Sequence, residues 1–348
     1  MDAADILLSC GSKLQDGRHT FVVDRVLGKG GFGITYRGRE TVSGREVAIK
    51  EYYPDICHPC RMTGGTIVPL PKFQAIYNQG KKSFMNEAAM LKALDDIPSA
   101  VRILAYFEAN GTAYMVMEFL NGQTLRSMVE KNGPIPMEEL MPRMLPLMRD
   151  ISAMHERGVL HRDIAPDNIM WMPDGTLKLL DFGCARAVED GKSMTVQLKP
   201  GFAPLEQYQT HGQGDYTDIY ALCASIYFCI TGLVPPASPE RVFAMDGNSP
   251  DPLPWPKSLN IQIPEELEYL LMWGLSVYPS TRPQTMKQLT DRIECIRLPE
   301  KGKTKKTPGP VSLFSKSSGS VTIPRIVVLG FCVAAGIAVC AFLIYLLL

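Results

Sequence analysis

His161-Arg162-Asp163-Ile164-Ala165-Pro166-Asp167-Asn168 is the most informative stretch of this sequence. It places a carboxylate, Asp163, and an amide, Asn168, on one short segment. A second carboxylate, Asp181, follows thirteen residues after Asn168 and opens the triplet Asp181-Phe182-Gly183. Carboxylate and amide oxygens are ligands that Mg²⁺ accepts, and a further carboxylate beside them can take up a proton. The pattern therefore predicts a proton acceptor next to a metal site.

These two motifs, H-R-D-x-x-x-x-N and D-F-G in this order and at this spacing, resemble the catalytic loop and the metal-binding loop of protein kinases. Either motif alone would be weak evidence, because D-F-G is common by chance. The resemblance implies that Asp163 orients a substrate serine or threonine hydroxyl and accepts its proton. It also implies that Asn168 and Asp181 hold Mg²⁺, or Mn²⁺ in its place, against the phosphates of ATP.

A glycine-rich segment, residues 27–35, lies upstream and reads LGKGGFGIT. Glycines let a backbone approach phosphates closely, but G-x-G-x-x-G also occurs in hairpin turns and in dinucleotide folds. A dinucleotide fold needs a helix directly after the last glycine, whereas residues 34–37 and 47–50 alternate like two strands. The segment thus resembles the phosphate-binding loop of kinases. By that resemblance the nucleotide-binding residues of this region are Leu27, Gly28, Gly30, Gly33, Thr35, Ala48 and Lys50.

The Val-Ala-Ile-Lys strand ending at Lys50 resembles the third strand of kinases, whose lysine pairs with the α- and β-phosphates. That lysine needs a carboxylate partner to hold its ammonium in place. Residues 82–91 carry apolar side chains at helical spacing and resemble the kinase helix αC, so Glu87 is the predicted partner. Glu51 is the competitor, but neighbouring residues of a strand point to opposite faces.

Residues 114–122 read as a buried strand that runs into a glycine turn. In kinases this stretch is the hinge between two lobes, and the resemblance makes Met117 the gatekeeper. It also implies that the backbones of Glu118 and Leu120 bond the adenine ring. A plain core strand is compatible with the same pattern.

Three residues farther along match the family in order. Glu206 resembles the glutamate of the A-P-E segment, although Pro and Leu fill the Ala and Pro positions. Asp218 resembles the aspartate that braces the catalytic loop, and Arg282 resembles the arginine that pairs with the A-P-E glutamate. A buried, bidentate pair between Glu206 and Arg282 is therefore expected.

The catalytic loop departs from the serine/threonine pattern at Ala165, where those kinases carry a lysine that contacts the γ-phosphate. Tyrosine kinases share the alanine but add an arginine where this chain has Asp167. Lys199 stands seven residues before Glu206, where serine/threonine kinases have a threonine. We hypothesise that Lys199 supplies the missing charge, because an ammonium acts as a point charge that can come from another segment. A solvent-facing lysine is the alternative, and the sequence leaves both open.

Arg162 directly precedes the catalytic aspartate, an arrangement in which kinases often use phosphorylation to order the activation segment. Ser193 and Thr195 lie in that segment and are the candidate phosphate acceptors. Unmodified loop hydroxyls are the alternative reading.

Composition and cysteine spacing narrow the remaining functional classes. The 36 basic side chains (Lys and Arg) equal the 36 acidic ones, so no footprint for nucleic acid is present. The 9 cysteines form no disulfide framework. Cys57-His58-Pro59-Cys60 has the spacing of a zinc or redox motif, but no second ligand pair stands at a matching distance. An irregular surface loop is expected there.

Residues 326–348 contain no charge, and at about 1.5 Å per residue such a helix crosses a hydrocarbon layer of about 30 Å. Lysines in the linker before it place the catalytic domain in the cytoplasm and can contact anionic lipid headgroups. No signal peptide is expected, since the first residues are acidic. Gly330 and Gly336 lack the small-xxx-small spacing, so a homodimer through the span is left open.

We therefore expect an α+β, two-lobed protein kinase fold, with a small antiparallel lobe that carries αC and a larger helical lobe. The expected order is an N-terminal extension (1–20), a kinase domain (21–298), a basic linker rich in Ser, Pro and Gly (299–325) and a single-pass transmembrane helix (326–348). The expected activity is transfer of the γ-phosphate of Mg-ATP to serine or threonine of protein substrates. A membrane-anchored pseudokinase is the alternative, favoured by Ala165. A small-molecule kinase is less favoured, because those enzymes lack the activation segment.

Overall fold

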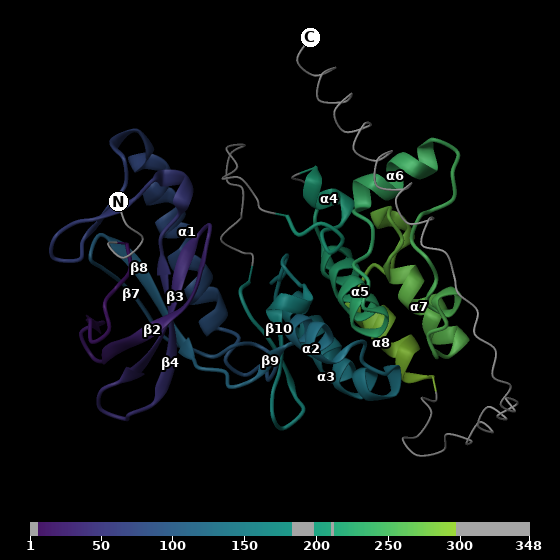
Figure 1. Cartoon of the computed structure of the whole chain (residues 1–348), viewed down its shortest axis with the longest axis horizontal. Coiled ribbons are helices and arrows are strands. Elements are labelled where there is room, and N and C mark those ends of the chain that lie inside the picture. Colours follow the sequence, from purple (N-terminus) through teal and green to yellow (C-terminus); the bar gives the residue numbers. More distant parts are fainter. Residues whose placement is uncertain (1–5, 183–197, 210–211, 297–348) are drawn as a thin grey trace, which may run out of the picture. The chain divides into compact units, whose positions relative to one another are not determined.

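A six-stranded antiparallel sheet forms the small lobe (Figure 1). The structure is a computed structural model and describes residues 6–182, 198–209 and 212–296. The strand order is β1-β2-β3-β4-β8-β7, so β1 adds an edge strand from the segment expected to be an N-terminal extension. The strands are β1 (Lys13–Gln15), β2 (Thr20–Gly30), β3 (Gly33–Glu40), β4 (Glu46–Tyr52), β7 (Ile103–Ala109) and β8 (Thr112–Glu118).

Burial follows the period of two that a strand imposes. In β3, Ile34 and Tyr36 are buried, while Thr35 between them and Arg37 after them are partly exposed. β8 lies between β4 and β7 and is buried at every position before Glu118. Helix α1 (Gln74–Lys92) packs on β7 and β8 and buries Phe84 and Leu91. The helix predicted over residues 82–91 is thus present, and it begins eight residues earlier.

The segment between β4 and α1 is more ordered than the loop predicted for it. Arg61 donates to the fully buried carboxylate of Glu51 at 2.6 Å, and the hydroxyls of Tyr36 and Tyr114 donate to the same carboxylate. Burying a charge is tolerated when its hydrogen bonds are satisfied in this way. The segment contains η2 (Asp55–Cys57), the hairpin of β5 (Cys60–Arg61) and β6 (Ile67–Val68), and η3 (Pro71–Phe73).

This cluster holds Glu51 on the face of β4 away from Lys50, as the alternation of side chains predicted. Cys57 is buried beside it, and burial raises the pKa of its thiol. Among the residues that the structure describes, no group of three or more His, Cys, Asp or Glu side chains could hold a metal ion.

Helices build the large lobe around α5 (Asp215–Thr231), which contacts α2, α7 and α8. Residues 217–230 of α5 are all buried, as in a core helix that is apolar all round. Gly274 permits the close approach of α7, because a Cβ there would collide with the Cys223 sulfur. The helices are α2 (Leu125–Asn132), α3 (Met137–Glu156), α4 (Leu205–Tyr208), α6 (Ser238–Asp246), α7 (Glu265–Gly274) and α8 (Met286–Glu294). The short elements are β9 (Gln123–Thr124), β10 (Ile169–Trp171), β11 (Leu177–Leu179), η4 (Pro166–Asn168), η6 (Pro256–Leu259) and η7 (Pro279–Thr281).

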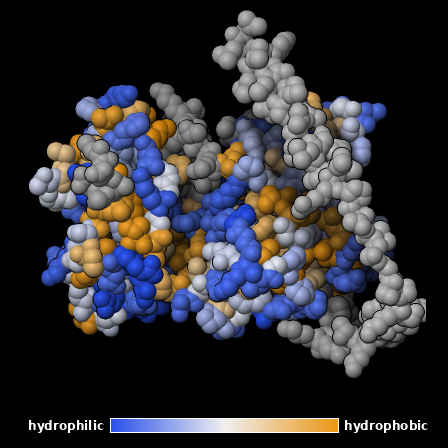
Figure 2. All heavy atoms as spheres, in the orientation of Figure 1, coloured by the Kyte–Doolittle hydropathy of each residue, from blue (hydrophilic) through white to orange (hydrophobic). Residues whose placement is uncertain are grey.

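Hydrophobic and hydrophilic side chains are interspersed on the face shown in Figure 2. Within the described part of the chain, no helix has both the length and the hydropathy to cross a membrane. The predicted linker (299–325) and span (326–348) lie outside the described residues, as do Ser193 and Thr195. The predicted α+β architecture of a small sheet lobe and a large helical lobe is confirmed.

Candidate active site

The catalytic loop rests on the buried carboxylate of Asp218, in the first turn of α5. Asp218 accepts the backbone N–H groups of His161 and Arg162, each at 2.8 Å, and it lies 2.8 Å from Nε2 of His155. Burial alone would raise the pKa of Asp218, but the hydrogen bonds and the charge of His155 outweigh it and lower that pKa. These bonds hold Arg162 at a φ of 63°, a left-handed conformation that few non-glycine residues adopt. The bracing role predicted for Asp218 agrees with this geometry.

Asp163 and Asn168 are joined directly. The Nδ2 atom of Asn168 donates to both the carbonyl and the Oδ2 atom of Asp163, each at 2.9 Å. Since the amide nitrogen faces Asp163, the amide oxygen is the atom that Asn168 can offer to a metal. The turn η4 ends at Asn168 and brings the two side chains together.

Asp181 follows β11 and is connected to the same loop by its neighbours. Leu180 donates its N–H to the carbonyl of Asn168 at 2.8 Å, and its carbonyl lies 3.0 Å from Nε2 of His161. The buried ring of Phe182 packs against that of His161, with 4.3 Å between centroids. Asp181 itself has a φ of 47°. The three predicted residues Asp163, Asn168 and Asp181 are therefore brought together.

Lys50 reaches this cluster from β4 of the small lobe. Its Nζ atom lies 2.7 Å from Oδ1 of Asp181, and the charge of Lys50 lowers the pKa of that carboxyl. Burial alone would lower the pKa of Lys50, but Asp181 and then Glu87 outweigh it and raise that pKa above its ordinary value. Glu87 is buried on α1, close enough for its charge to act on Lys50. The ion pair of Lys50 is thus made with Asp181, and its predicted pairing with Glu87 stays a prediction.

The glycine-rich loop joins β2 to β3, and the strands predicted at residues 34–37 and 47–50 lie within β3 and β4. Gly33 must be glycine, because a Cβ there would collide with the carbonyl of Glu51. Gly28 and Gly30 have open space around them, which is the side from which a ligand could approach. Thr35 pairs with Lys50 across β3 and β4. Two further residues were predicted to contact the nucleotide. Leu27 lies on β2 and is 39% exposed, and Ala48 lies on β4, where it pairs with Arg37 of β3.

The predicted hinge lies where β8 ends. The N–H of Glu118 donates to the carbonyl of Arg102 at 3.0 Å, so only its carbonyl could bond an adenine. Its carboxylate accepts Lys178 Nζ at 2.7 Å. Leu120 is nearly buried, and Met117 pairs with Ala48 of β4. The adenine contacts of Glu118 and Leu120 stay predictions.

Lys199 lies beside Asp163, the predicted proton acceptor. Its Nζ atom is 3.3 Å from Oδ2 of Asp163, and both residues line a small hollow with Phe202 and Gln207. The Nε2 atom of Gln207 donates to the carbonyl of Arg162 at 2.7 Å, which ties the segment after Lys199 to the catalytic loop. Lys199 was predicted either to supply the charge missing from the catalytic loop or to face solvent. Its position beside Asp163 favours the first alternative.

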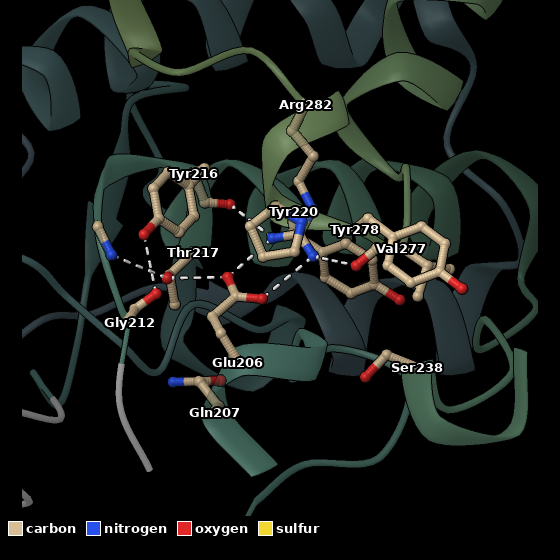
Figure 3. Close-up of polar contacts among 12 residues, drawn as sticks. Glu206, Gln207, Gly212, Tyr216, Thr217, Tyr220, Ser238, Val277, Tyr278 and Arg282 are labelled. Carbon is tan, nitrogen blue, oxygen red and sulfur yellow. Dashed lines mark hydrogen bonds and ion pairs between the residues drawn. The ribbon is translucent and has the colours of Figure 1, made fainter. Parts of the chain in front are cut away.

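Glu206 and Arg282 form the buried pair that the sequence predicted (Figure 3). Two guanidinium nitrogens donate to the two carboxylate oxygens at 2.8 and 3.2 Å, and the hydroxyl of Thr217 donates to the same carboxylate at 3.0 Å. The guanidinium also donates to the carbonyls of Tyr216 and Val277. The pair therefore fixes α4, and the segment before it, against α5 and η7.

Sequence reasoning missed two residues of the site. His155 lies six residues before His161 and contacts Asp218, and Gln207 holds the carbonyl of Arg162. A buried helix end next to the catalytic motif was the available signal for His155. Gln207 gave no signal, because its contact joins segments 45 residues apart.

The fold and the site define a protein kinase domain. The sequence profile described as "Protein kinase domain" matches residues 21–292. Serine/threonine-protein kinase pkn2 of Myxococcus xanthus is 30% identical over an alignment of 335 positions, and the match covers 90% of this chain and 37% of that protein. Serine/threonine-protein kinase PknB of Mycobacterium leprae is 28% identical, over 86% of this chain and 47% of that protein.

Solved structures agree. The apo form of PpkA-294 is 33% identical with a TM-score of 0.71, and the match covers 82% of this chain and 99% of that one. A structure of Rad53 at 20% identity and a TM-score of 0.61 shares the fold. The chain belongs to the protein kinase family, and both curated relatives are named as serine/threonine-protein kinases. It spans less than half of the length of the two curated relatives.

We predict that Asp218→Asn lowers the free energy of unfolding by about 1.5–3 kcal/mol at neutral pH, because two backbone N–H groups lose a charged acceptor. The pKa of Asp218 is lower in the folded chain than its usual 3.8, so this carboxylate favours folding above pH 3.8. That contribution is lost as the pH falls through the folded-state value. The difference between wild type and variant in urea unfolding should therefore shrink on acidification below about pH 4.

The control is Asp215→Asn, which changes a partly exposed carboxylate in the same helical turn. It should change the unfolding free energy by less than about 1 kcal/mol. A difference between wild type and Asp218→Asn that stays constant or grows on acidification would contradict the bracing role.

Proposed function

We propose that this protein is a kinase that transfers the γ-phosphate of Mg-ATP to serine or threonine hydroxyls of protein substrates. The observation that carries the proposal is the convergence of Lys50 from β4, Asp163 and Asn168 from the catalytic loop, and Asp181 from the segment after β11. Contacts of 2.7–2.9 Å link them in two pairs, Lys50–Asp181 and Asp163–Asn168. The names of the curated relatives support the serine/threonine class.

The donor set fits a magnesium ion and a nucleotide. The amide oxygen of Asn168 and the carboxylate of Asp181 are hard oxygen ligands, and the lowered pKa of Asp181 keeps it ionised at neutral pH. When bound there, Mg²⁺ would neutralise charge on the phosphates. Open space beside Gly28 and Gly30 leaves room for phosphates against the backbone of the loop.

Each of the predicted site residues has a defined task in this mechanism. The Asp163 carboxylate, held by Asn168, accepts the proton of the attacking hydroxyl. Lys50 keeps its proton at neutral pH because its pKa is raised, and it can exchange Asp181 for the α- and β-phosphates. Glu87, buried on α1, stabilises the same ammonium. The backbones of Glu118 and Leu120 orient the adenine.

Lys199 replaces the lysine that the catalytic loop lacks. Ala165 is fully buried, and the Lys199 ammonium reaches the Asp163 carboxylate from the activation segment instead. A cation at this place can stabilise the negative charge of the transferring phosphoryl group.

We expect Lys199→Ala to lower kcat by about 10²-fold, the usual cost of one lost electrostatic contact to a transition state. Lys199→Arg should retain more activity, because it keeps the positive charge. Lys257→Ala, which removes an exposed lysine paired with Glu265, should leave kcat unchanged. An unchanged kcat in Lys199→Ala would show that this lysine has no role in phosphoryl transfer.

The activity itself is tested with labelled ATP and Mg²⁺. Wild type should incorporate phosphate into protein serine or threonine, and Asp163→Asn should lose about 10²–10⁴-fold in rate while it still binds nucleotide. If wild type binds nucleotide but transfers no phosphate, the pseudokinase alternative is correct. If Asp163→Asn loses nucleotide binding as well, Asp163 is not the proton acceptor.

We propose in addition that residues 326–348 tether the kinase domain to the cytoplasmic face of a membrane. Support comes from the uncharged stretch and from the lysines that precede it. The full chain should sediment with membranes and resist extraction at alkaline pH, whereas a chain that ends at residue 298 should stay in the supernatant. Equal solubility of the two chains would rule out the tether.

A further inference from the structure

The glycine-rich loop is bonded to the chain that follows β4. Tyr53 donates its N–H to the carbonyl of Phe32 at 3.1 Å, and Asp55 donates its N–H to the carbonyl of Gly31 at 2.9 Å. A side-chain contact adds to these two bonds. The ammonium of Lys29, next to the last residue of β2, lies 3.0 Å from the carboxylate of Asp55 and 5.6 Å from the centroid of the Tyr53 ring.

Asp55 is itself anchored to the core of the small lobe. It opens η2, and its carbonyl accepts the N–H of His58 at 3.0 Å. Cys57, at the end of η2, is fully buried. The hairpin that follows is tied to the sheet by the buried pair of Arg61 and Glu51. A contact with Asp55 is therefore a contact with the framework of the sheet.

The loop needs such support because glycines give it many conformations. Ordering it around phosphates costs conformational entropy, and any contact that orders it beforehand reduces that cost on binding. We propose that Asp55 is a positioning residue for the nucleotide: through Lys29 it holds the glycine-rich loop where its backbone meets the phosphates. This inference rests on the proposed nucleotide binding, and it assigns a role to the ordered insert between β4 and α1.

A direct role of Lys29 predicts the opposite response to mutation. If the ammonium of Lys29 contacted the phosphates instead, Asp55 would compete for it, and Asp55→Asn would tighten nucleotide binding. If Asp55 positions the loop, the same variant weakens binding. One substitution therefore separates the two roles by the sign of its effect.

The test uses the full chain and a non-hydrolysable ATP analogue with Mg²⁺. Asp55→Asn should raise the dissociation constant by about two- to five-fold, the range expected for one partly exposed ion pair. The KM for ATP should rise with it, while kcat and the KM for the protein substrate stay unchanged. The effect should fade at about 1 M salt, because exposed charges are screened.

Charge exchange provides the rescue. Lys29→Asp alone should bind the analogue most weakly, and the double variant Lys29→Asp with Asp55→Lys should recover most of the wild-type affinity. A direct phosphate contact predicts no recovery, because the loop would then carry a negative charge. Asp291→Asn is the matched control, since it breaks an exposed pair of 2.7 Å with Lys287 on α8 and should change nothing.

Hydrogen exchange in nucleotide-free protein measures how firmly the glycine-rich loop is held, and it requires neither nucleotide binding nor kinase activity. The amide of Tyr53 should exchange faster in Asp55→Asn than in wild type, because its bond to the loop opens more often. If wild type binds no nucleotide, the proposed function fails, and the exchange data still decide whether Asp55 holds the loop. If wild type binds, and Asp55→Asn binds equally well or more tightly, the positioning role is wrong.

Discussion

The ion pair between Lys50 and Asp181 connects the sheet of the small lobe to the metal-binding loop of the large lobe. The two residues are 131 positions apart in the sequence, and their charged atoms lie 2.7 Å apart. Each charge stabilises the ionised form of the other, as the raised pKa of Lys50 and the lowered pKa of Asp181 show. The site can act on a nucleotide only if these two charges meet at one place, one for phosphate and one for metal.

Three buried carboxylates give the framework behind that meeting point its rigidity. Glu51 organises the small lobe, Asp218 holds the catalytic loop, and Glu206 holds α4 to Arg282. Each has three hydrogen-bond donors, so each carboxylate is satisfied without exposure to water. Satisfied networks of this kind specify one arrangement of the chain, because removing a single donor leaves a buried carboxylate with one hydrogen bond too few.

Much of this arrangement could be predicted from local pattern. The spacing of Asp163, Asn168 and Asp181 places the first two on one loop and the third on a second loop, and a few hydrogen bonds can hold these two loops together. Strand alternation places Glu51 on the face of β4 away from Lys50. The ion pair of Glu206 could be predicted because its partner, Arg282, stands in a recognisable motif. These signals are either short in sequence or carried by residue types whose chemistry has few alternatives.

The remainder depended on long-range contacts that no local pattern encodes. The insert between β4 and α1 was expected to be irregular, because its Pro and Gly residues obscure a hairpin whose Arg61 contacts Glu51 in the sheet. The direct partner of Lys50 depended on how the metal-binding loop approaches the sheet, which the sequence does not state. Lys199 could be named as a candidate only by position, and its distance to Asp163 needed the folded chain.

The most direct measurement is the magnesium dependence of nucleotide binding in wild type and in Asp181→Asn. Titration of the full chain with a non-hydrolysable ATP analogue should show at least about tenfold tighter binding with Mg²⁺ than without it, because the Asp181 carboxylate would hold a metal ion that neutralises phosphate charge. In Asp181→Asn this gain should disappear. Equal affinity with and without Mg²⁺ in wild type, or an undiminished gain in the variant, would contradict the convergence of charges on which the assignment rests.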